Sequence, residues 1–325
     1  MKTGFIIILL IVSVSTALSD PYGETIRDDS SQLYYSGGTN LLISSQNPHD
    51  WRKHLEIESI LVEDDLTVEE MRYICQIPNI KVIQLGKSPE VMKLRPAVLN
   101  ELINAKRLQS ISLNVDSLTL TEADLKIFLK IPQISFFSLF VGPDWEVIGN
   151  MADKLVPLED KIGFRIAELR NLKSLHILSD SKFTNSFLKR LAELKNLSDL
   201  DINSFSFGDE SLRILGKMNL SRLSISLPKT DLLSFYGLRN SPIRELALRD
   251  INQKLSFTVV LNESAYESLL SMRNLETIHM LKYLAFEGPN SMEKMQSLKR
   301  HLERNRLKNA RKVEQIEAAN GGRGN

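Results

Sequence analysis

The residues of this chain that could carry chemistry are few and scattered. Ser138, His176 and Asp201 occur in the order of a serine hydrolase triad, in which a serine attacks, a histidine accepts its proton and an aspartate orients the histidine. Such a reaction requires the serine to lie roughly 3 Å from its base, with hydrogen-bond donors nearby for the oxyanion. Whether these residues meet depends on the elements that position them.

Metal and cofactor chemistry has weaker support. The histidines are spread along the chain, and the single cysteine, Cys75, precludes an intramolecular disulfide and offers no cysteine cluster for zinc. No phosphate-binding loop, dinucleotide fingerprint or H-E-x-x-H motif is present. We therefore predict no metal and no cofactor. The five histidines are His49, His54, His176, His279 and His301.

A recurring ladder of aliphatic residues gives the strongest structural signal. One copy reads Leu188, Leu191, Leu194, Leu197, Leu200 and Ile202. The first part of each copy has helical spacing, and the second part, of the form L-x-x-L-x-L, alternates as a half-buried strand does. A short turn with Asn often joins the two. Nine such strand cores begin at Ile57, Ile80, Leu108, Ile134, Leu172, Leu197, Leu220, Ile243 and Leu275.

This pattern resembles the leucine-rich repeat family, and within it the bacterial-type repeats of roughly two dozen residues with a helix on the convex side. The segment 183–202, FTNSFLKRLAELKNLSDLDI, is the best match, and the resemblance covers about residues 55–285. It implies an α/β fold, a solenoid with a curved parallel sheet on the concave side and helices on the convex side. The Asn or Cys that the family usually has after the strand is mostly missing.

The resemblance also implies two rows of side chains on the concave face, listed here by strand. The central row is Gln84, Ser112, Ser138, His176, Asp201, Ser224, Ala247 and His279. The row nearer the strand starts is Val82, Ser110, Phe136, Ser174, Asp199, Arg222, Glu245 and Thr277. Asp201 should then lie beside His176 as a partly solvated pair, while Ser138 is too loosely placed for catalysis. We expect no enzyme.

Surface contacts are the better functional hypothesis. Phe136 and Phe140 are large apolar groups at concave positions, and they are either exposed anchors for a partner or covered by the insertion after Val141. A mixed-charge stretch follows in the later repeats, where charge on a rigid face gives specificity. The predicted partner-binding residues are Phe136, Phe140, His176, Asp199, Asp201, Arg222, Glu245 and Arg249.

The beginning of the chain indicates export. Residues 1–19 read as a signal peptide, because a short apolar run from Phe5 to Val14 follows Lys2 and precedes small residues. We expect a flexible leader and N-terminal cap over residues 20–54, the solenoid over 55–290, and a disordered tail over 319–325. The lack of disulfides favours a bacterial periplasmic or secreted protein.

The repeats leave two long gaps between cores. One lies between Ile134 and Leu172 and is either a loop or a degenerate repeat. The other lies between Ile243 and Leu275, where the β-prone run LSFTVVL at 255–261 could add a strand. Such insertions often carry function.

Charge is balanced overall, with 41 Lys and Arg against 40 Asp and Glu, so nucleic acid is not an expected partner. The exception is a basic amphipathic helix predicted over residues 291–318. It either caps the last repeat or contacts an acidic partner or membrane surface. The sequence thus favours a secreted, monomeric scaffold that binds a protein; the alternative is an envelope or surface structural protein that uses this helix, and an exported hydrolase comes third.

Overall fold

The computed structural model describes residues 25–27, 34–36, 40–43, 57–62, 65–86, 95–115, 121–141, 160–178, 184–202, 208–227, 235–250, 259–279, 284–286 and 290–321. The predicted signal peptide lies outside these residues, as does the insertion after Val141. Within the described ranges, no helix combines the length and apolarity that a membrane span requires.

Strands and helices alternate along most of the chain. The strands are β1 (Thr25–Arg27), β2 (Tyr34–Ser36), β3 (Asn40–Ile43), β4 (Ser59–Val62), β5 (Val82–Leu85), β6 (Ser110–Val115), β7 (Phe136–Val141), β8 (Ser174–Leu178), β9 (Asp199–Ile202), β10 (Arg222–Leu227), β11 (Glu245–Asp250), β12 (Val259–Leu261), β13 (Thr277–His279) and β14 (Leu284–Phe286). The α-helices are α2 (Val68–Cys75), α3 (Pro96–Glu101), α4 (Glu122–Phe128), α5 (Asp160–Ile166), α6 (Asn185–Leu191), α7 (Asp209–Gly216), α8 (Glu263–Ser271) and α9 (Ser291–Gly321). Two 3-10 helices, Leu102–Asn104 and Phe235–Leu238, complete the set.

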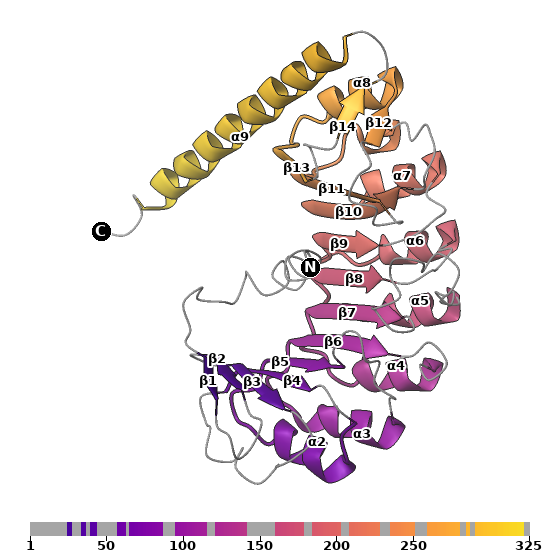
Figure 1. Ribbon diagram of the computed structural model, residues 1–325, viewed down its shortest axis with the longest axis vertical. Helices are drawn as coiled ribbons and strands as arrows, with labels where there is room; N and C mark the ends of the chain where they lie inside the picture. Colours follow the sequence, from indigo (N-terminus) through magenta and orange to yellow (C-terminus); the bar gives the residue numbers. More distant parts are fainter. Residues whose placement is uncertain are drawn as a thin grey trace, which may run out of the picture.

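One 12-stranded sheet forms the spine of the molecule, in the order β1 to β11 and then β13. Every pairing from β3 to β13 is parallel, as expected when a helix returns the chain to the same edge between strands. Figure 1 shows the strands along the inner side of a curved stack and α2 to α7 along its outer side. The α/β class and the parallel sheet are therefore as predicted.

The predicted strand cores all lie in this sheet, in β4 to β11 and β13. Leu175, Leu200 and Leu223 are register partners on β8, β9 and β10, and each is fully buried. The same inward stripe continues through the neighbouring strands, so one aliphatic core runs the length of the stack. This continuity explains why no unit needs a closed core of its own.

The helices begin at residues suited to cap them. Thr67 accepts a hydrogen bond from the backbone of Glu70 while Glu70 bonds back to the backbone of Thr67, and Thr121 and Asp124 form the same capping box. Thr184 and Asn262 cap α6 and α8 with a single side-chain bond each. The apolar residues of each helix then face the sheet.

The turns before the strands form a polar ladder between repeats. The Nδ2 of Asn171 donates to the carbonyl oxygen of Pro132 at 2.6 Å, and that of Asn196 donates to Arg170 at 3.5 Å. Asn274 reaches the carbonyl oxygen of Ser241 at 3.4 Å in the same way. The turn Asn predicted from the repeats thus satisfies a backbone carbonyl of the preceding turn and ties neighbouring repeats together.

Two segments outside the nine predicted cores also contribute strands. Residues 20–54, predicted to form a flexible leader and N-terminal cap, contain β1, β2 and β3, which extend the sheet, with β1–β2 and β2–β3 antiparallel. The β-prone run at 255–261 ends in β12, which pairs in parallel with β14 in a second, small sheet. The latter strand was one of the outcomes foreseen for the second gap.

Helix α9 closes the far end of the stack. Leu298 and Leu302 are buried against the last repeat, and the Nδ2 of Asn305 donates to the carbonyl oxygens of Met272 at 3.2 Å and Leu275 at 2.9 Å. Asn305 thereby takes the place of the turn Asn of a further repeat, whose side chain would donate to a carbonyl oxygen of this turn. The helix then runs on past the repeats and projects from the stack (Figure 1). Residues 298–309 of α9 thus pack on the end of the last repeat, and capping was one of the two roles predicted for this helix.

Candidate binding face on the strands

The two rows predicted on the inner face are present in register. The central row pairs from Gln84 on β5 to His279 on β13, and the row nearer the strand starts pairs from Val82 to Thr277. Along β7 and β8, row positions are half-buried and alternate with buried core residues. The strands therefore position the predicted side chains on one continuous face.

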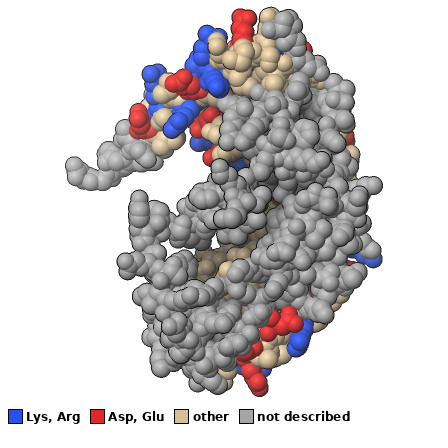
Figure 2. Space-filling view, viewed as in Figure 1, with Lys and Arg blue, Asp and Glu red and all other residues tan. Residues whose placement is uncertain are grey.

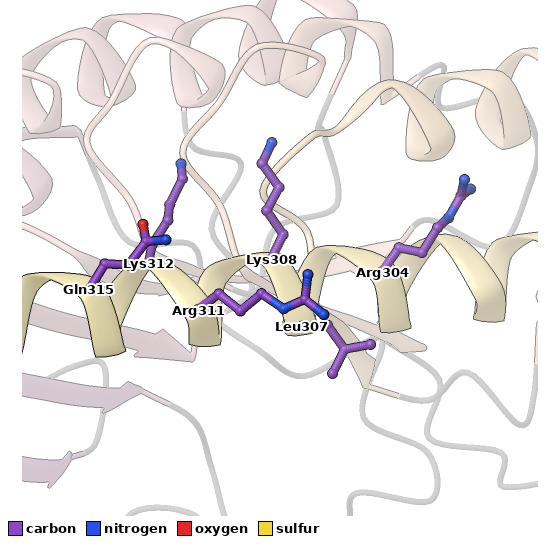
Figure 3. A pocket seen from close by; sticks show the side chains of 6 residues that line it. All are labelled: Arg304, Leu307, Lys308, Arg311, Lys312 and Gln315. Carbon is purple, nitrogen blue, oxygen red and sulfur yellow. The ribbon is translucent and has the colours of Figure 1, made fainter.

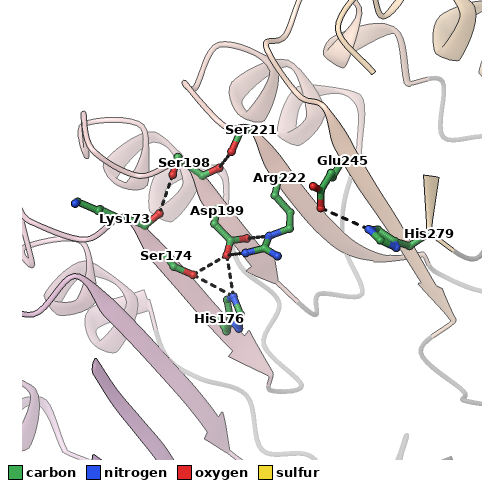
Figure 4. Close-up of polar contacts among 9 residues, drawn as sticks. All are labelled: Lys173, Ser174, His176, Ser198, Asp199, Ser221, Arg222, Glu245 and His279. Carbon is green, nitrogen blue, oxygen red and sulfur yellow. Dashed lines mark hydrogen bonds and ion pairs between the residues drawn. The ribbon is translucent and has the colours of Figure 1, made fainter. Parts of the chain in front are cut away.

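A compact group, here called the Asp199 cluster, occupies the middle of this face and consists of Phe136, Ser174, His176, Asp199 and Arg222. Figure 4 shows its four polar members. Ser174 donates from Oγ to Oδ2 of Asp199 at 2.8 Å. Arg222 donates from Nε to Oδ1 at 2.8 Å and from Nη2 to Oδ2 at 2.5 Å. His176 Nε2 lies 3.3 Å from the same Oδ2.

These contacts set the ionisation of the cluster. Burial of Asp199 acts to raise the pKa of its carboxyl, but hydrogen bonds from His176, Arg222 and Ser174 outweigh this and lower the pKa to about 2. The hydrogen bond and the charge of Asp199 raise the pKa of Arg222 in turn, against its partial burial. Asp199 is thus a buried anion held by three donors of adjacent strands, while half of the Arg222 side chain stays exposed.

The expected pair of His176 with Asp201 needs correction. Asp201 is the register partner of His176, as predicted, yet the ion pair of His176 that the structure describes is with Asp199, on the diagonal. The reason is that Asp199 also meets Arg222 and Ser174, so its carboxylate is the point where donors from two strands converge. Strand register determines which residue lies opposite His176. Which carboxylate its side chain contacts depends on where the donors of neighbouring strands converge.

The cluster lacks the geometry of a hydrolase triad. A triad uses both nitrogens of the imidazole, one facing the serine and the other facing the aspartate. Here Ser174 Oγ and Asp199 Oδ2 both face Nε2 of His176, at 3.1 and 3.3 Å. Ser174 also donates to Asp199, so its hydroxyl proton is directed at the carboxylate rather than at a base. This arrangement suits a fixed polar surface and not a nucleophile.

Phe136 brings an aromatic surface to the cluster. Its ring meets that of His176 edge to face, with centroids 4.9 Å apart. Phe136 and Phe140 are both half-buried, so each keeps some surface that a partner can reach. The insertion that was considered as a cover for them lies outside the described residues.

A second histidine pair lies further along the face. His279 Nε2 is 3.6 Å from a carboxylate oxygen of Glu245, and both side chains are about half exposed. The geometry repeats that of His176, because in each case a central-row histidine reaches diagonally to an acid of the other row (Figure 4). Arg249, also predicted for this site, lies on β11 opposite Ser226, and its side chain is outside the described part of the chain.

The predicted site residues omitted two contributors. Ser174 was placed in a row but not in the site, and its role follows only from its bond to Asp199. A polar groove of about 520 Å³ at the strand starts was also not foreseen; it is lined by Ser198, Asn219, Leu220, Ser221, Pro242, Arg244, Glu245 and Asn274. The serines there tie repeats together, since Ser221 donates to the Ser198 carbonyl oxygen and Ser198 to that of Lys173 (Figure 4).

Metal ligation and thiol chemistry find no support among the described residues. No group of three or more His, Cys, Asp or Glu is arranged to hold a metal ion in these ranges. Cys75 is buried in α2, and burial raises the pKa of its thiol to about 12. Cys75 is therefore part of the core, and its thiol is unreactive because the thiolate form is strongly disfavoured.

Comparison with known proteins adds no identification. The sequence matches no model of a protein family, and it matches no curated protein. The described fold is an α/β stack with one long, mostly parallel sheet, whose inner face carries the Asp199 cluster.

Proposed function

We propose that this chain is a leucine-rich-repeat-type scaffold that recognises a protein partner through the inner, concave face of its sheet. The repeated L-x-x-L-x-L pattern supports the family assignment together with the parallel register of the strands that carry it. A rigid face built from adjacent short strands suits recognition of another macromolecule, because its side chains are fixed before binding.

The observation that carries the proposal is the Asp199 cluster. The buried carboxylate of Asp199, which Ser174 and His176 of β8 also contact, fixes the position of Arg222, whose side chain remains half exposed. Phe136 lies at the other side of the same group, against His176. An aromatic ring and a held arginine are the residue types that dominate binding energy in protein interfaces.

Charge on the same face supports selectivity. Asp199 and Glu245 flank Arg222 on the adjacent strands, so positive and negative groups alternate across β9, β10 and β11. A partner with the complementary order of charges is attracted, and one with the opposite order is repelled. The partner class proposed is therefore a folded protein with mixed charge and an apolar recess for Phe136.

Partner capture tests this proposal. The mature chain is used as bait in extracellular and envelope extracts, captured proteins are identified by mass spectrometry, and each is then purified and titrated. Phe136→Asp should weaken binding at least about tenfold. The matched control is Tyr236→Asp, since Tyr236 is an aromatic residue that is 59% exposed on the helical side of the stack. Equal affinity of the Phe136→Asp variant and the wild type, with unchanged melting curves, would count against the concave face.

Export and a non-enzymatic role belong to the same proposal. The charged start, short apolar run and small residues of 1–19 support cleavage of a signal peptide near Ala17 or Ser19. The chain would then act outside the cytoplasm as a monomer. N-terminal sequencing of the protein recovered from its native source tests the first point, and a start at Met1 would contradict it.

A further inference from the structure

Residues 298–309 and residues 310–315 of α9 have different surroundings. Leu298, Leu302, Asn305 and Asn309 face the last repeat and are buried, at spacings that keep them on one side of the helix. From Ala310 to Gln315 every residue is exposed. Since the helix is 31 residues long, it continues well beyond what the cap requires.

A basic stripe runs along another side of this helix. Arg304, Lys308, Arg311 and Lys312 follow the spacing of neighbours on one helical face, and together with Leu307 and Gln315 they line a shallow hollow of about 380 Å³. Figure 3 shows Arg304, Lys308 and Lys312 leaving the helix toward the same side. In the space-filling view, blue side chains gather on the projecting helix with red ones among them (Figure 2).

The stripe is not neutralised by its own protein. Within the part of the chain that the structure describes, no carboxylate forms an ion pair with Lys308, Arg311 or Lys312. Glu303 and Glu314 border the stripe on the side of Leu307, and Glu314 is three positions after Arg311, but the structure describes no ion pair between either glutamate and these cations. Uncompensated cations on one exposed side of a helix attract an anionic surface.

One exposed leucine borders the cations, and an exposed valine lies on the cap side of the helix. Leu307 is 55% exposed beside the stripe, and Val313, on the side that earlier carries the cap residues, is 45% exposed. A helix with Lys and Arg along one side and accessible aliphatic groups beside them suits the boundary between headgroups and acyl chains. The hollow is lined by α9 alone, so it presents an open side of one helix to a partner surface.

We propose that the basic side of α9 binds an anionic lipid surface, with Arg304, Lys308, Arg311 and Lys312 contacting the phosphates of lipid headgroups. This site is separate from the concave face and does not depend on the function proposed for it. It also reconciles the two roles considered for the helix, because the cap uses one side of α9 and the lipid surface would meet another. The solenoid would then be held near a membrane while its inner face stays open.

Vesicle co-sedimentation tests the proposal with the full mature chain. We expect binding to vesicles of equal parts phosphatidylcholine and phosphatidylglycerol, and release by high salt, since the attraction is electrostatic. The variant Lys308→Gln, Arg311→Gln, Lys312→Gln should bind about a hundredfold more weakly. The matched control removes three exposed cations from the convex side, Lys189→Gln, Arg190→Gln and Lys195→Gln, and should bind as the wild type does.

Several outcomes would overturn the proposal. Equal binding by the two triple variants would show that net charge, and not the stripe, governs association. Equal binding to vesicles of phosphatidylcholine alone would remove the role of headgroup charge. Binding of poly-glutamate that depends on the stripe, without binding of vesicles, would assign the stripe to an acidic polypeptide instead. All variants change exposed residues, so matching melting curves can establish that each chain is folded.

Discussion

At the scale of single residues, Asp199 is the group on which the inner face depends. Its side chain is only 11% exposed, yet it keeps a negative charge because Ser174, His176 and Arg222 all direct hydrogen bonds or charge at it. A buried carboxylate is tolerated only when such partners replace its lost water. The cluster therefore couples β8, β9 and β10 through side chains as well as through the sheet.

Replacing this carboxylate should weaken the fold. In Asp199→Asn the shape is nearly kept, but the negative charge that pairs with Arg222 is lost and one of the two acceptor oxygens becomes a donor NH2 group, at a cost of about 1–3 kcal/mol in the free energy of unfolding. Urea denaturation at neutral pH measures it. Glu210→Gln is the control, because Glu210 is exposed and its partner Arg213 is 3.9 Å away. A loss as small as that of the control would mean that the cluster does not contribute to stability.

Acid should remove the same contribution. The pKa of Asp199 is lowered from 3.8 to about 2, so its ionised form stabilises the folded chain above the ordinary pKa. This stabilisation, about 2 kcal/mol, is lost as the pH falls from near 4 toward 2. The difference in unfolding free energy between the wild type and Asp199→Asn should therefore narrow over that range. A difference that stays constant with pH would contradict the assigned ionisation.

The sequence predicted which residues line the face but not how they pair. Register follows from the aliphatic pattern, so Ser138, His176 and Asp201 fall in one row as expected. The partner of His176 depends on side-chain direction and on competition for one carboxylate, which repeat spacing does not encode. For that reason Asp201 was expected beside His176 as its partner, and the contribution of Ser174 was not anticipated.

At the scale of elements, the turn after β5 depends on a glycine. Gly86 has a φ of 85°, and a Cβ there would lie 2.4 Å from the backbone oxygen of Asn114. Gly86→Ala should cost more than about 2 kcal/mol, because it combines a left-handed backbone with a clash against rigid main chain. Gly208→Ala, where a Cβ meets nothing within 4 Å, should cost at most about 1 kcal/mol. Thermal unfolding measures the stability of both variants. Equal losses of stability would contradict the special role of Gly86 in this turn.

Helix α9 offers a matched pair of leucines for testing its cap. Leu298 is fully buried against the last repeat, while Leu307 on the same helix is 55% exposed. Leu298→Ala should lower the free energy of unfolding by about 2–4 kcal/mol through lost burial and the cavity left behind. Leu307→Ala should change it by less than about 1 kcal/mol. If both variants unfold at the same urea concentration as the wild type, α9 does not cap the stack.

At the scale of the whole molecule, the periodic spacing of aliphatic residues was sufficient to predict most of the fold. The nine strand cores, the alternating helices and the terminal helix follow from aliphatic spacing that each repeat restates. The strands β1, β2 and β3 were not foreseen, because segments of three or four residues are too short to show the periodicity that distinguishes a strand from a loop. The basic residues of α9 could be recognised from the sequence. That they lie on a different side of the helix from the cap could be seen only from the burial of Asn305 and Asn309 in the structure.

The measurement that tests the proposed concave binding face most directly is hydrogen exchange of the whole chain with and without a purified partner. We predict slower exchange in peptides from β7 to β11, where the Asp199 cluster lies, and no change in α4 to α7 on the outer side. Slower exchange confined to the outer helices would contradict the account.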